Sequence, residues 1–372
     1  MLSDPHGSFL PALWYHDLRD LWQGNAVRVN ARWGRLKSPG EKGKLVWIAS
    51  GADHASVRLG AALTGAIREM RLDLRLVLTF EREYPELLHA LTELDRCGHG
   101  YAPCDYRSAI KRAWRRFQPF GMIYAGVLPR RNLVHASSTL KHVLAVGTAA
   151  AAPLRLERAY PASEKQAQSW RTTPQAPIAD LLTLVTTAQV EPTFRTLVNG
   201  AAERHLWWWH GNDGTAASRF ADAFLQALPQ DLLFVSGTDD LPQATQRLSY
   251  WQHQALPAGV VLADQARWLP AVAACCTAAH LAAEDNETLW QALAGGNATS
   301  CADHTHLPKR ELAEAVTICT DAAAVLRHWQ ECRDNSHHAR HLGDAARRTF
   351  WQERRLAAEV SNELLERVFN WD

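Results

Sequence analysis

The chain has 372 residues, 47% of them hydrophobic and 21% charged, and its 40 basic and 39 acidic residues leave a net charge of +1. This length predicts two domains, and the charge balance gives no reason to expect a polyanion such as nucleic acid as a partner. Seven scattered cysteines without a CxxC pair, no secretory signal and no apolar run of about 18 residues favour a cytoplasmic protein with free thiols.

The N-terminal segment 9–36, FLPALWYHDLRDLWQGNAVRVNARWGRL, mixes Phe, Leu and Trp with Arg. Such a mixture is typical of a helix that lies in a membrane interface. It is equally compatible with a helix that packs on its own domain. Both interpretations stay open. The first of them predicts that the chain contacts the inner membrane peripherally.

The first half of the chain alternates strands with helices. Buried strands are predicted at 45–49, 72–80 and 121–125, with an amphipathic helix from about Val57 and a basic helix before the third strand. A further helix and strand follow in 132–147, and 148–177 reads as a helix with loops. The run IADLLTLVTT, 178–187, predicts another buried strand.

The second half repeats this alternation. RHLWWWHGNDGTAASRFADAFLQAL reads as strand, Gly-rich turn and helix, and QDLLFVSGTDD as strand and turn. Further strand and helix patterns follow as far as 319, and long helices close the chain. The predicted fold is therefore α/β, with two Rossmann-like doubly wound parallel sheets facing across a cleft. We expect an N-terminal domain over 1–192, a C-terminal domain over 193–345, and a helix over 346–372 that packs back on the N-terminal domain.

Several segments, in order and at similar spacing, carry a resemblance to a known family. They are NARWGRL, KLVWIAS with VRLGAALTGAIRE, LDLRLVLT, MIYAGVLPRRNLVHA, HLWWWHGNDGT and ETLWQALAGGNATSCADH. Together they resemble the Kdo (3-deoxy-D-manno-octulosonic acid) transferases, which are GT-B glycosyltransferases. The resemblance implies metal-independent, inverting transfer of a sugar from CMP-Kdo to an envelope glycolipid, a lipopolysaccharide precursor, without a cofactor. It also implies work at the cytoplasmic face of the inner membrane.

The chain departs from this family at four places. Ala55 or Ser56 stands where the family has its catalytic Glu, and Ser236 with Gly237 replaces a Pro-Arg pair. Trp290 replaces the Glu of an Asn-Pro-Leu-Glu motif, and Gly126 with Val127 replaces an acidic pair. These losses leave three hypotheses open. The chain is a divergent glycosyltransferase, an enzyme that uses another donor, or a catalytically inactive paralogue that acts as a binding or scaffold protein.

Candidate site residues lie in the turns that follow predicted strands. In SGADHAS, Asp53 or His54 is the candidate catalytic base, although Asp53 or Ser56 would equally cap a helix. The turn HGNDGT and two later segments are candidates for binding the nucleotide-sugar donor, because backbone amides and glycines approach phosphate easily. Plain turns and acidic helix caps explain the same residues. The donor candidates are His210, Gly211, Asn212, Gly214, Thr215, Ser236, Glu284, Asn286 and Glu287.

Two further motifs carry weaker signals. The histidines of 304–306 and 336–338 form no complete ligand set with known spacing, so no metal site is predicted. The basic helix face KRAWRRF, 111–117, suits either anionic lipid headgroups or simple solvation.

Overall fold

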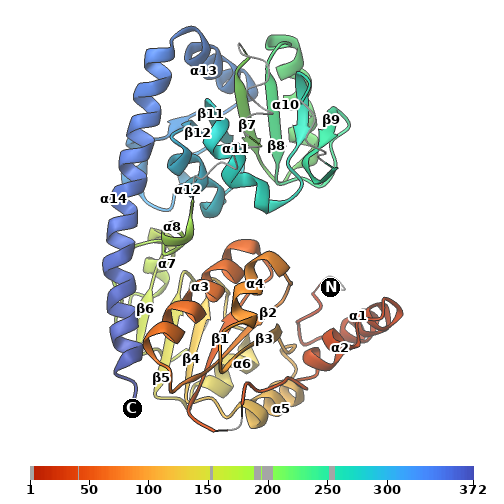
Figure 1. The fold of residues 1–372 in the computed structure, drawn as a ribbon, viewed down its shortest axis with the longest axis vertical. Helices are drawn as coiled ribbons and strands as arrows, with labels where there is room; N and C mark the ends of the chain where they lie inside the picture. The colour runs from red at the N-terminus through yellow and green to blue at the C-terminus, as the bar shows by residue number, and fades with distance from the viewer. Residues whose placement is uncertain (1–3, 41, 151–153, 188–193, 195–203, 251–255) are drawn as a thin grey trace. The chain divides into compact units, whose positions relative to one another are not determined.

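The computed structural model describes residues 4–40, 42–150, 154–187, 194, 204–250 and 256–372. The chain forms two units, one made of residues 1–185 and 356–372 and the other of residues 186–355. The boundary predicted between 192 and 193 lies outside the described residues. Each unit contains its own parallel sheet with helices packed on it (Figure 1), which confirms the predicted α/β class with two Rossmann-like domains.

The N-terminal unit is built on a six-stranded parallel sheet with the order β3-β2-β1-β4-β5-β6. Continuous apolar runs make its central strands, since both faces of such a sheet are covered by helices. All residues of β1, β2, β4 and β5 are buried. The strands are β1 (Leu45–Ser50), β2 (Arg75–Phe80), β3 (Cys97–Tyr101), β4 (Gly121–Ala125), β5 (His142–Val146) and β6 (Arg158–Tyr160).

The helices of this unit connect the strands, and several begin at a capping or proline residue. Asp53 caps one of them and Ser163 caps another, while proline opens the helix that starts at Pro85. They are α3 (His54–Met70), α4 (Pro85–Thr92), α5 (Arg107–Phe117), α6 (Arg131–Ser137), α7 (Glu164–Ser169) and α8 (Leu182–Val185).

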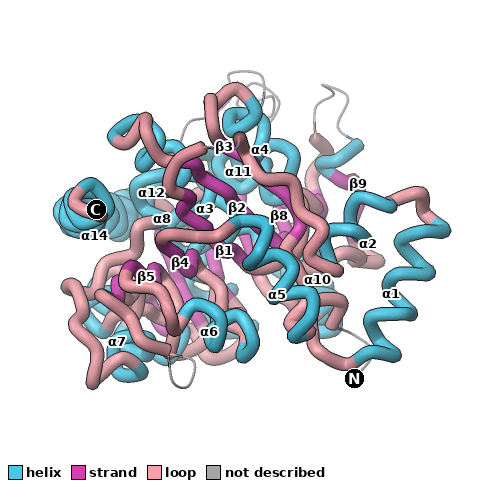
Figure 2. Tube along the Cα trace, turned by 90° about the horizontal axis from the view of Figure 1, so that it is seen from below, coloured by secondary structure: helices cyan, strands magenta, loops and turns pink. Residues whose placement is uncertain are grey.

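The N-terminal segment forms two helices that lie side by side (Figure 2), α1 (Leu10–Trp22) and α2 (Ala26–Arg32). Arg32 is fully buried and pairs with both Asp17 and Asp20 of α1. Trp33 adds a hydrogen bond of 2.6 Å from its Nε1 to Asp17 Oδ2. One face of α1 thus packs on its own domain, as one of the two sequence interpretations expected.

The C-terminal unit is built on a seven-stranded parallel sheet with the order β13-β12-β11-β7-β8-β10-β9. Its first strand is the tryptophan run, and Trp207 and Trp208 are fully buried on opposite faces. The strands are β7 (Leu206–His210), β8 (Leu232–Ser236), β9 (Ala244–Arg247), β10 (Gly259–Leu262), β11 (Ala278–Leu281), β12 (Ala298–Cys301) and β13 (Thr317–Ile318).

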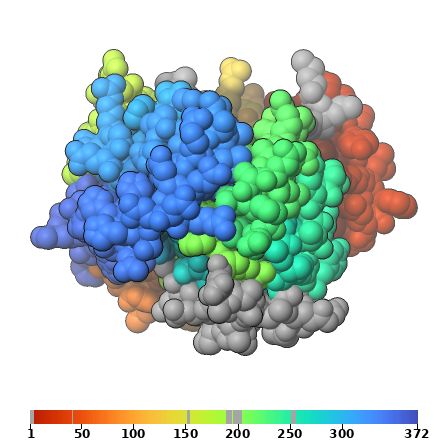
Figure 3. Space-filling model, turned by 90° about the horizontal axis from the view of Figure 1, so that it is seen from above, coloured from red at the N-terminus to blue at the C-terminus, as the bar shows by residue number. Residues whose placement is uncertain are grey.

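The helices that connect or cover this sheet include α10 (Gly214–Ala227), α11 (Leu269–Cys275), α12 (Asn286–Gly295) and α13 (Ala322–Asp334). Trp329 of α13 is buried between Trp207, at 5.2 Å between ring centroids, and Phe220 of α10, at 5.3 Å. On the face drawn in Figure 3, the C-terminal residues coloured blue adjoin the green residues of this unit. The buried aromatic rings fix α10 and α13 against one face of the sheet.

The last helix, α14 (Ser336–Phe369), has 34 residues and contributes to both units. Its final turns belong to the N-terminal unit. Trp371 is buried against Gly121 of β4, and its Nε1 donates to Glu157 Oε2 at 3.0 Å. Glu363 pairs with Arg158 at 2.8 Å and with Arg367 at 3.1 Å.

The strand predicted over 178–187 is wrong. Asp180 instead starts a short helix, because its Oδ1 accepts from the Leu182 amide at 3.0 Å and its carbonyl from the Thr183 hydroxyl at 2.7 Å. A polar residue that satisfies the first free amides favours a helical turn over an extended chain. Three short strands, β3, β6 and β9, were not predicted, since none shows a continuous apolar run.

Candidate functional site

The carboxyl edge of the N-terminal sheet holds a cavity of about 470 Å³. It lies where the order of the parallel strands switches sides, because β1 pairs with β2 on one side and with β4 on the other. Ligands of doubly wound sheets bind in this crevice. Its polar lining residues are Asp53, Glu81, Asp105, Arg130 and Arg131.

Asp53 and His54, the two predicted bases, point to different surroundings. Asp53 is exposed and lines the cavity while its Oδ1 accepts from the Ser56 amide at 2.8 Å as the cap of α3. His54 packs edge-on against Tyr84 at 5.1 Å, and its Nε2 is 3.9 Å from Glu86 Oε1. His54 does not line this cavity. The structure therefore brings only Asp53 to the cavity.

An ion-pair cluster centred on Arg130 lies at the same cavity, which Arg130 and Glu81 line. Arg130 donates from Nε to Glu81 Oε1 at 2.7 Å and from Nη1 to Asp4 Oδ2 at 2.8 Å. Burial raises the pKa of Glu81 above its ordinary value, and this effect exceeds the opposing attraction of Arg130. None of these residues was predicted from the sequence, although Glu81 directly follows the predicted strand 72–80.

The segment around His6 contacts Glu81 and Asp105, two residues that line the cavity. The His6 ring is buried and its Nε2 donates to the Glu81 carbonyl at 3.2 Å, while the His6 carbonyl accepts from the Asp105 amide at 2.8 Å. Burial, reinforced by the positive charges of Arg130 and Arg32, lowers the pKa of His6 to about 3. His6 is therefore neutral at physiological pH and positions the backbone at the end of β2.

The carboxyl edge of the C-terminal sheet carries a chain of hydrogen bonds through His210. Trp208 Nε1 donates to Ser236 Oγ at 2.9 Å, and Ser236 Oγ lies 2.8 Å from His210 Nδ1. His210 Nε2 lies 3.1 Å from Asp285 Oδ2. Because an indole only donates, the Ser236 hydroxyl is free to donate to Nδ1, and Nε2 carries the ring proton toward Asp285.

This chain joins β7, β8 and the start of α12 at the point where β7 lies between β8 and β11. Burial opposes the charged form of Asp285, but hydrogen bonds from His210 and Thr288 outweigh it and hold the pKa of Asp285 below its ordinary value. Both ring nitrogens of His210 are thus occupied by protein groups. His210 orders the predicted donor site rather than presenting a free nitrogen to a ligand.

The helix starts at this edge are capped by carboxylates. Asp213 Oδ1 accepts from the Thr215 amide at 2.9 Å and from the Ala216 amide at 3.2 Å. Asp285 Oδ1 accepts likewise from the Glu287 amide at 3.0 Å and more weakly from the next amide. Amides of this kind bind phosphate when they are open, so a donor phosphate would have to compete with both caps.

The remaining predicted donor residues differ in exposure. Asn212, Thr215 and Glu284 are exposed, Gly214 and Asn286 are half-buried, and Glu287 is buried. Gly211 is buried, and a side chain there would meet the Trp209 ring at 2.6 Å, so this turn needs glycine for packing. The segments 206–218, 232–238 and 278–291 contain neither Lys nor Arg.

Within the described part of the chain, no three His, Cys, Asp or Glu side chains come together in a group that could hold a metal ion. In the same residues, every helix is too short or too polar to cross a bilayer.

Comparisons with known proteins show the fold. No protein-family model and no curated protein matches the chain. A putative UDP-N-acetylglucosamine 2-epimerase from Listeria monocytogenes superimposes with a TM-score of 0.59 at 10% identity, over 86% of this chain and 95% of that one. UDP-GlcNAc 2-epimerase from Neisseria meningitidis gives 0.55 at 10% identity over 87% and 100%. WaaG, a glycosyltransferase involved in lipopolysaccharide biosynthesis, gives 0.51 at 9% identity over 86% and 98%. The chain therefore has the GT-B fold.

Proposed function

We propose that this GT-B protein is a nucleotide-sugar-dependent glycosyltransferase that modifies an envelope glycolipid, a lipopolysaccharide precursor. The observation that supports it is the cavity at the carboxyl edge of the N-terminal sheet, which holds the carboxylates of Asp53 and Glu81. An acceptor hydroxyl needs such a group within hydrogen-bond reach. The donor would bind at the corresponding edge of the C-terminal sheet, around Asn212, Thr215 and Asn286.

In this proposal the reaction is a single displacement that inverts the anomeric carbon and needs no metal. Asp53 takes the proton of the acceptor hydroxyl, the hydroxyl oxygen forms the new bond to the sugar, and the bond to the nucleotide phosphate breaks. Glu81 shares the cavity, but Arg130 engages its carboxylate. Asp53 is exposed and one of its carboxylate oxygens caps α3, which makes it the better base.

The donor is either CMP-Kdo or another nucleotide sugar. The Neisseria meningitidis neighbour was solved bound to UDP-GlcNAc, and WaaG is involved in lipopolysaccharide biosynthesis. These relatives make a UDP-sugar a reasonable donor to test beside CMP-Kdo. In this proposal the chain uses such a donor at the cytoplasmic face of the inner membrane.

A second candidate is an inactive GT-B paralogue that binds or organises other molecules. One observation favours it: the carboxylates of Asp213 and Asp285 occupy helix amides where a donor phosphate would bind. Both carboxylates repel a phosphate. The segments 206–218, 232–238 and 278–291, which form this edge, contain no Lys or Arg to offset that repulsion.

Calorimetric titration of the full chain with CMP, UDP and GDP separates these candidates. Binding of one nucleotide names the donor class, and binding of none supports the inactive paralogue. Turnover of the matching donor sugar is then measured for Asp53→Asn, His54→Gln and Glu81→Gln. We expect the Asp53 change to reduce turnover by a factor of about 10² to 10⁴ and the His54 change to leave it nearly unaltered. Loss of turnover only in Glu81→Gln would move the base to Glu81.

A further inference from the structure

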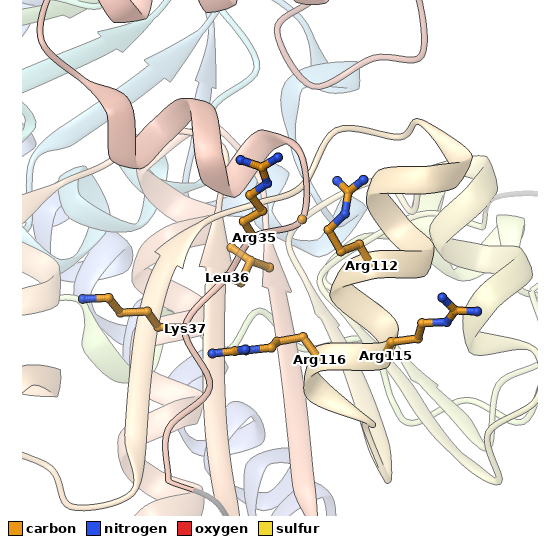
Figure 4. A pocket seen from close by; sticks show the side chains of 7 residues that line it. Arg35, Leu36, Lys37, Arg112, Arg115 and Arg116 are labelled. Atoms are coloured by element: carbon orange, nitrogen blue, oxygen red, sulfur yellow. The ribbon is translucent and has the colours of Figure 1, made fainter.

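A basic cavity of about 450 Å³ lies in the N-terminal unit and shares no lining residue with the carboxyl-edge cavity. Two elements build it, the last turns of α5 and the extended segment that follows α2. Figure 4 shows Arg116 extending from α5 toward the segment with Leu36 and Lys37, and Arg35 and Arg112 projecting in a common direction. Its cationic lining residues are Arg35, Lys37, Arg112, Arg115 and Arg116.

The backbone brings together the two elements that carry these cations. Gly34 has φ +74°, and a side chain on it would lie 2.2 Å from the Ala109 carbonyl oxygen of α5. Only glycine allows the segment to pass so close to the helix. Arg112 donates to the carbonyl of Trp33, which ties the two elements together at the same place.

The cavity lacks acidic groups. No Asp or Glu lines it, and within the described residues none of its five cations takes part in an ion pair. Five cations around one cavity create a positive potential there, and this potential attracts an anion. The ligand class that fits is a phosphate-bearing group, which arginine recognises with paired donors.

An apolar cavity of about 400 Å³ adjoins the basic one. The two share Arg35, Leu36 and Lys37. Its other lining residues are mostly hydrophobic or aromatic and come from α2, α5 and the strands β2 and β3: they include Val27, Ala31, Val77, Tyr101 and Phe117. The two cavities together suit an amphiphile, because the basic cavity would bind its phosphate and the apolar cavity its hydrocarbon part.

Helix α1 presents an apolar stripe in the same unit. Trp14, Tyr15, Leu18, Leu21 and Trp22 follow helical spacing along one face, and all five are exposed, Trp22 by 89% and Leu18 by 70%. Leu13, on the inner face of α1, packs with Ala109 of α5 in one hydrophobic cluster. The stripe is therefore held on the same packed assembly of helices as the basic cavity.

We propose that α1 and the basic cavity together form a docking surface for a bilayer that contains anionic phospholipids. The aromatic stripe enters the interface between headgroups and acyl chains, and the cations of the cavity hold a headgroup phosphate. Charge complementarity selects this occupant, because the cations of the cavity have no acidic partners among the described residues and the stripe belongs to a helix that packs with α5. Docking is independent of sugar transfer, so it holds for an enzyme and for an inactive paralogue alike.

Flotation of the full chain with vesicles tests the proposal. Vesicles of phosphatidylcholine with about one third phosphatidylglycerol are compared with vesicles of phosphatidylcholine alone. We expect binding to the anionic vesicles that weakens as salt rises. Replacing Lys37, Arg115 and Arg116 together by Gln should weaken the partition coefficient on the order of 100-fold. Leu18→Ser with Trp22→Ser should weaken it at least about tenfold.

A matched variant controls for net charge. Lys141, Arg155 and Arg340 are exposed and lie outside the cavity, so their joint replacement by Gln removes the same charge and should leave flotation unchanged. Equal flotation of both triple variants, or equal binding to both kinds of vesicle, would overturn the proposal. The proposal would also be overturned if the chain bound a single-stranded RNA more tightly than the anionic vesicles, and if Leu18→Ser with Trp22→Ser did not change that RNA binding. Such a result would assign the cations to nucleic acid.

Discussion

Substituting Gly34 by Ala tests how the chain passes over α5. The left-handed conformation at φ +74° costs an alanine about 1–2 kcal/mol. The new Cβ would also lie 2.2 Å from the Ala109 carbonyl oxygen and 3.0 Å from the Ala113 amide nitrogen. Both atoms belong to backbone and cannot turn away, so overpacking adds about 1–3 kcal/mol. We expect Gly34→Ala to lower the free energy of unfolding by about 2–5 kcal/mol.

The chain offers a matched control for this substitution. Gly24 has nearly the same backbone angle, φ +75°, but a Cβ on it meets nothing within 4 Å. Gly24→Ala therefore reports the conformational cost alone. Urea unfolding of both variants, followed by tryptophan fluorescence, should place the midpoint of Gly34→Ala well below that of Gly24→Ala. Equal midpoints would show that the segment does not approach α5 closely, and the basic cavity would lose its structural basis.

Four further outcomes follow from the structure. Asp53→Asn should lower donor turnover while nucleotide affinity stays unchanged, as measured by calorimetry on the same samples. Stability should fall by about 2 kcal/mol between pH 7 and pH 5 through His6, because its pKa of about 3 in the folded chain lies below the ordinary value and the unfolded chain binds the proton first. Urea unfolding of wild type and His6→Gln at both pH values measures this. Ser236→Ala should cost about 1–3 kcal/mol in the same assay, since Trp208 and His210 each lose a buried partner. Trp371→Ala should cost about 3–5 kcal/mol by leaving a cavity beside β4.

Each of these outcomes has a result that contradicts it. Undiminished turnover in Asp53→Asn would remove that residue from the reaction. An identical loss of stability with pH in His6→Gln and in wild type would assign the loss to other groups. Unchanged midpoints in Ser236→Ala or Trp371→Ala would mean that the polar chain, or the C-terminal contact with the sheet, is not formed as described.

The central strands could be predicted from sequence because burial on both faces demands continuous apolar residues. The segments 45–50 and 206–210 illustrate this, and both open a sheet as expected. By contrast, β3 reads Cys-Gly-His-Gly-Tyr and is held as a strand by pairing with β2. Its identity depends on a neighbour distant in sequence, which local pattern does not reveal.

The candidate site also combines residues that the local sequence predicts with residues that depend on distant neighbours. Asp53 was predictable because a polar turn after a buried strand marks the carboxyl edge of a sheet. The ion pair between Arg130 and Asp4 joins residues 126 positions apart, and no local signal connects them. Likewise, His210 was predicted as a donor ligand from its turn alone, and only the positions of Ser236 and Asp285 show that its ring is already engaged.

Hydrogen exchange with and without nucleotide tests the central claim, that the C-terminal sheet of this GT-B protein binds a nucleotide sugar at its carboxyl edge. Backbone amides are measured along the full chain in the presence of CMP, UDP or GDP. We expect one nucleotide to slow exchange in the turn 210–215 and at the start of α12, around 284–288. Unchanged exchange in both segments with all three nucleotides would contradict it.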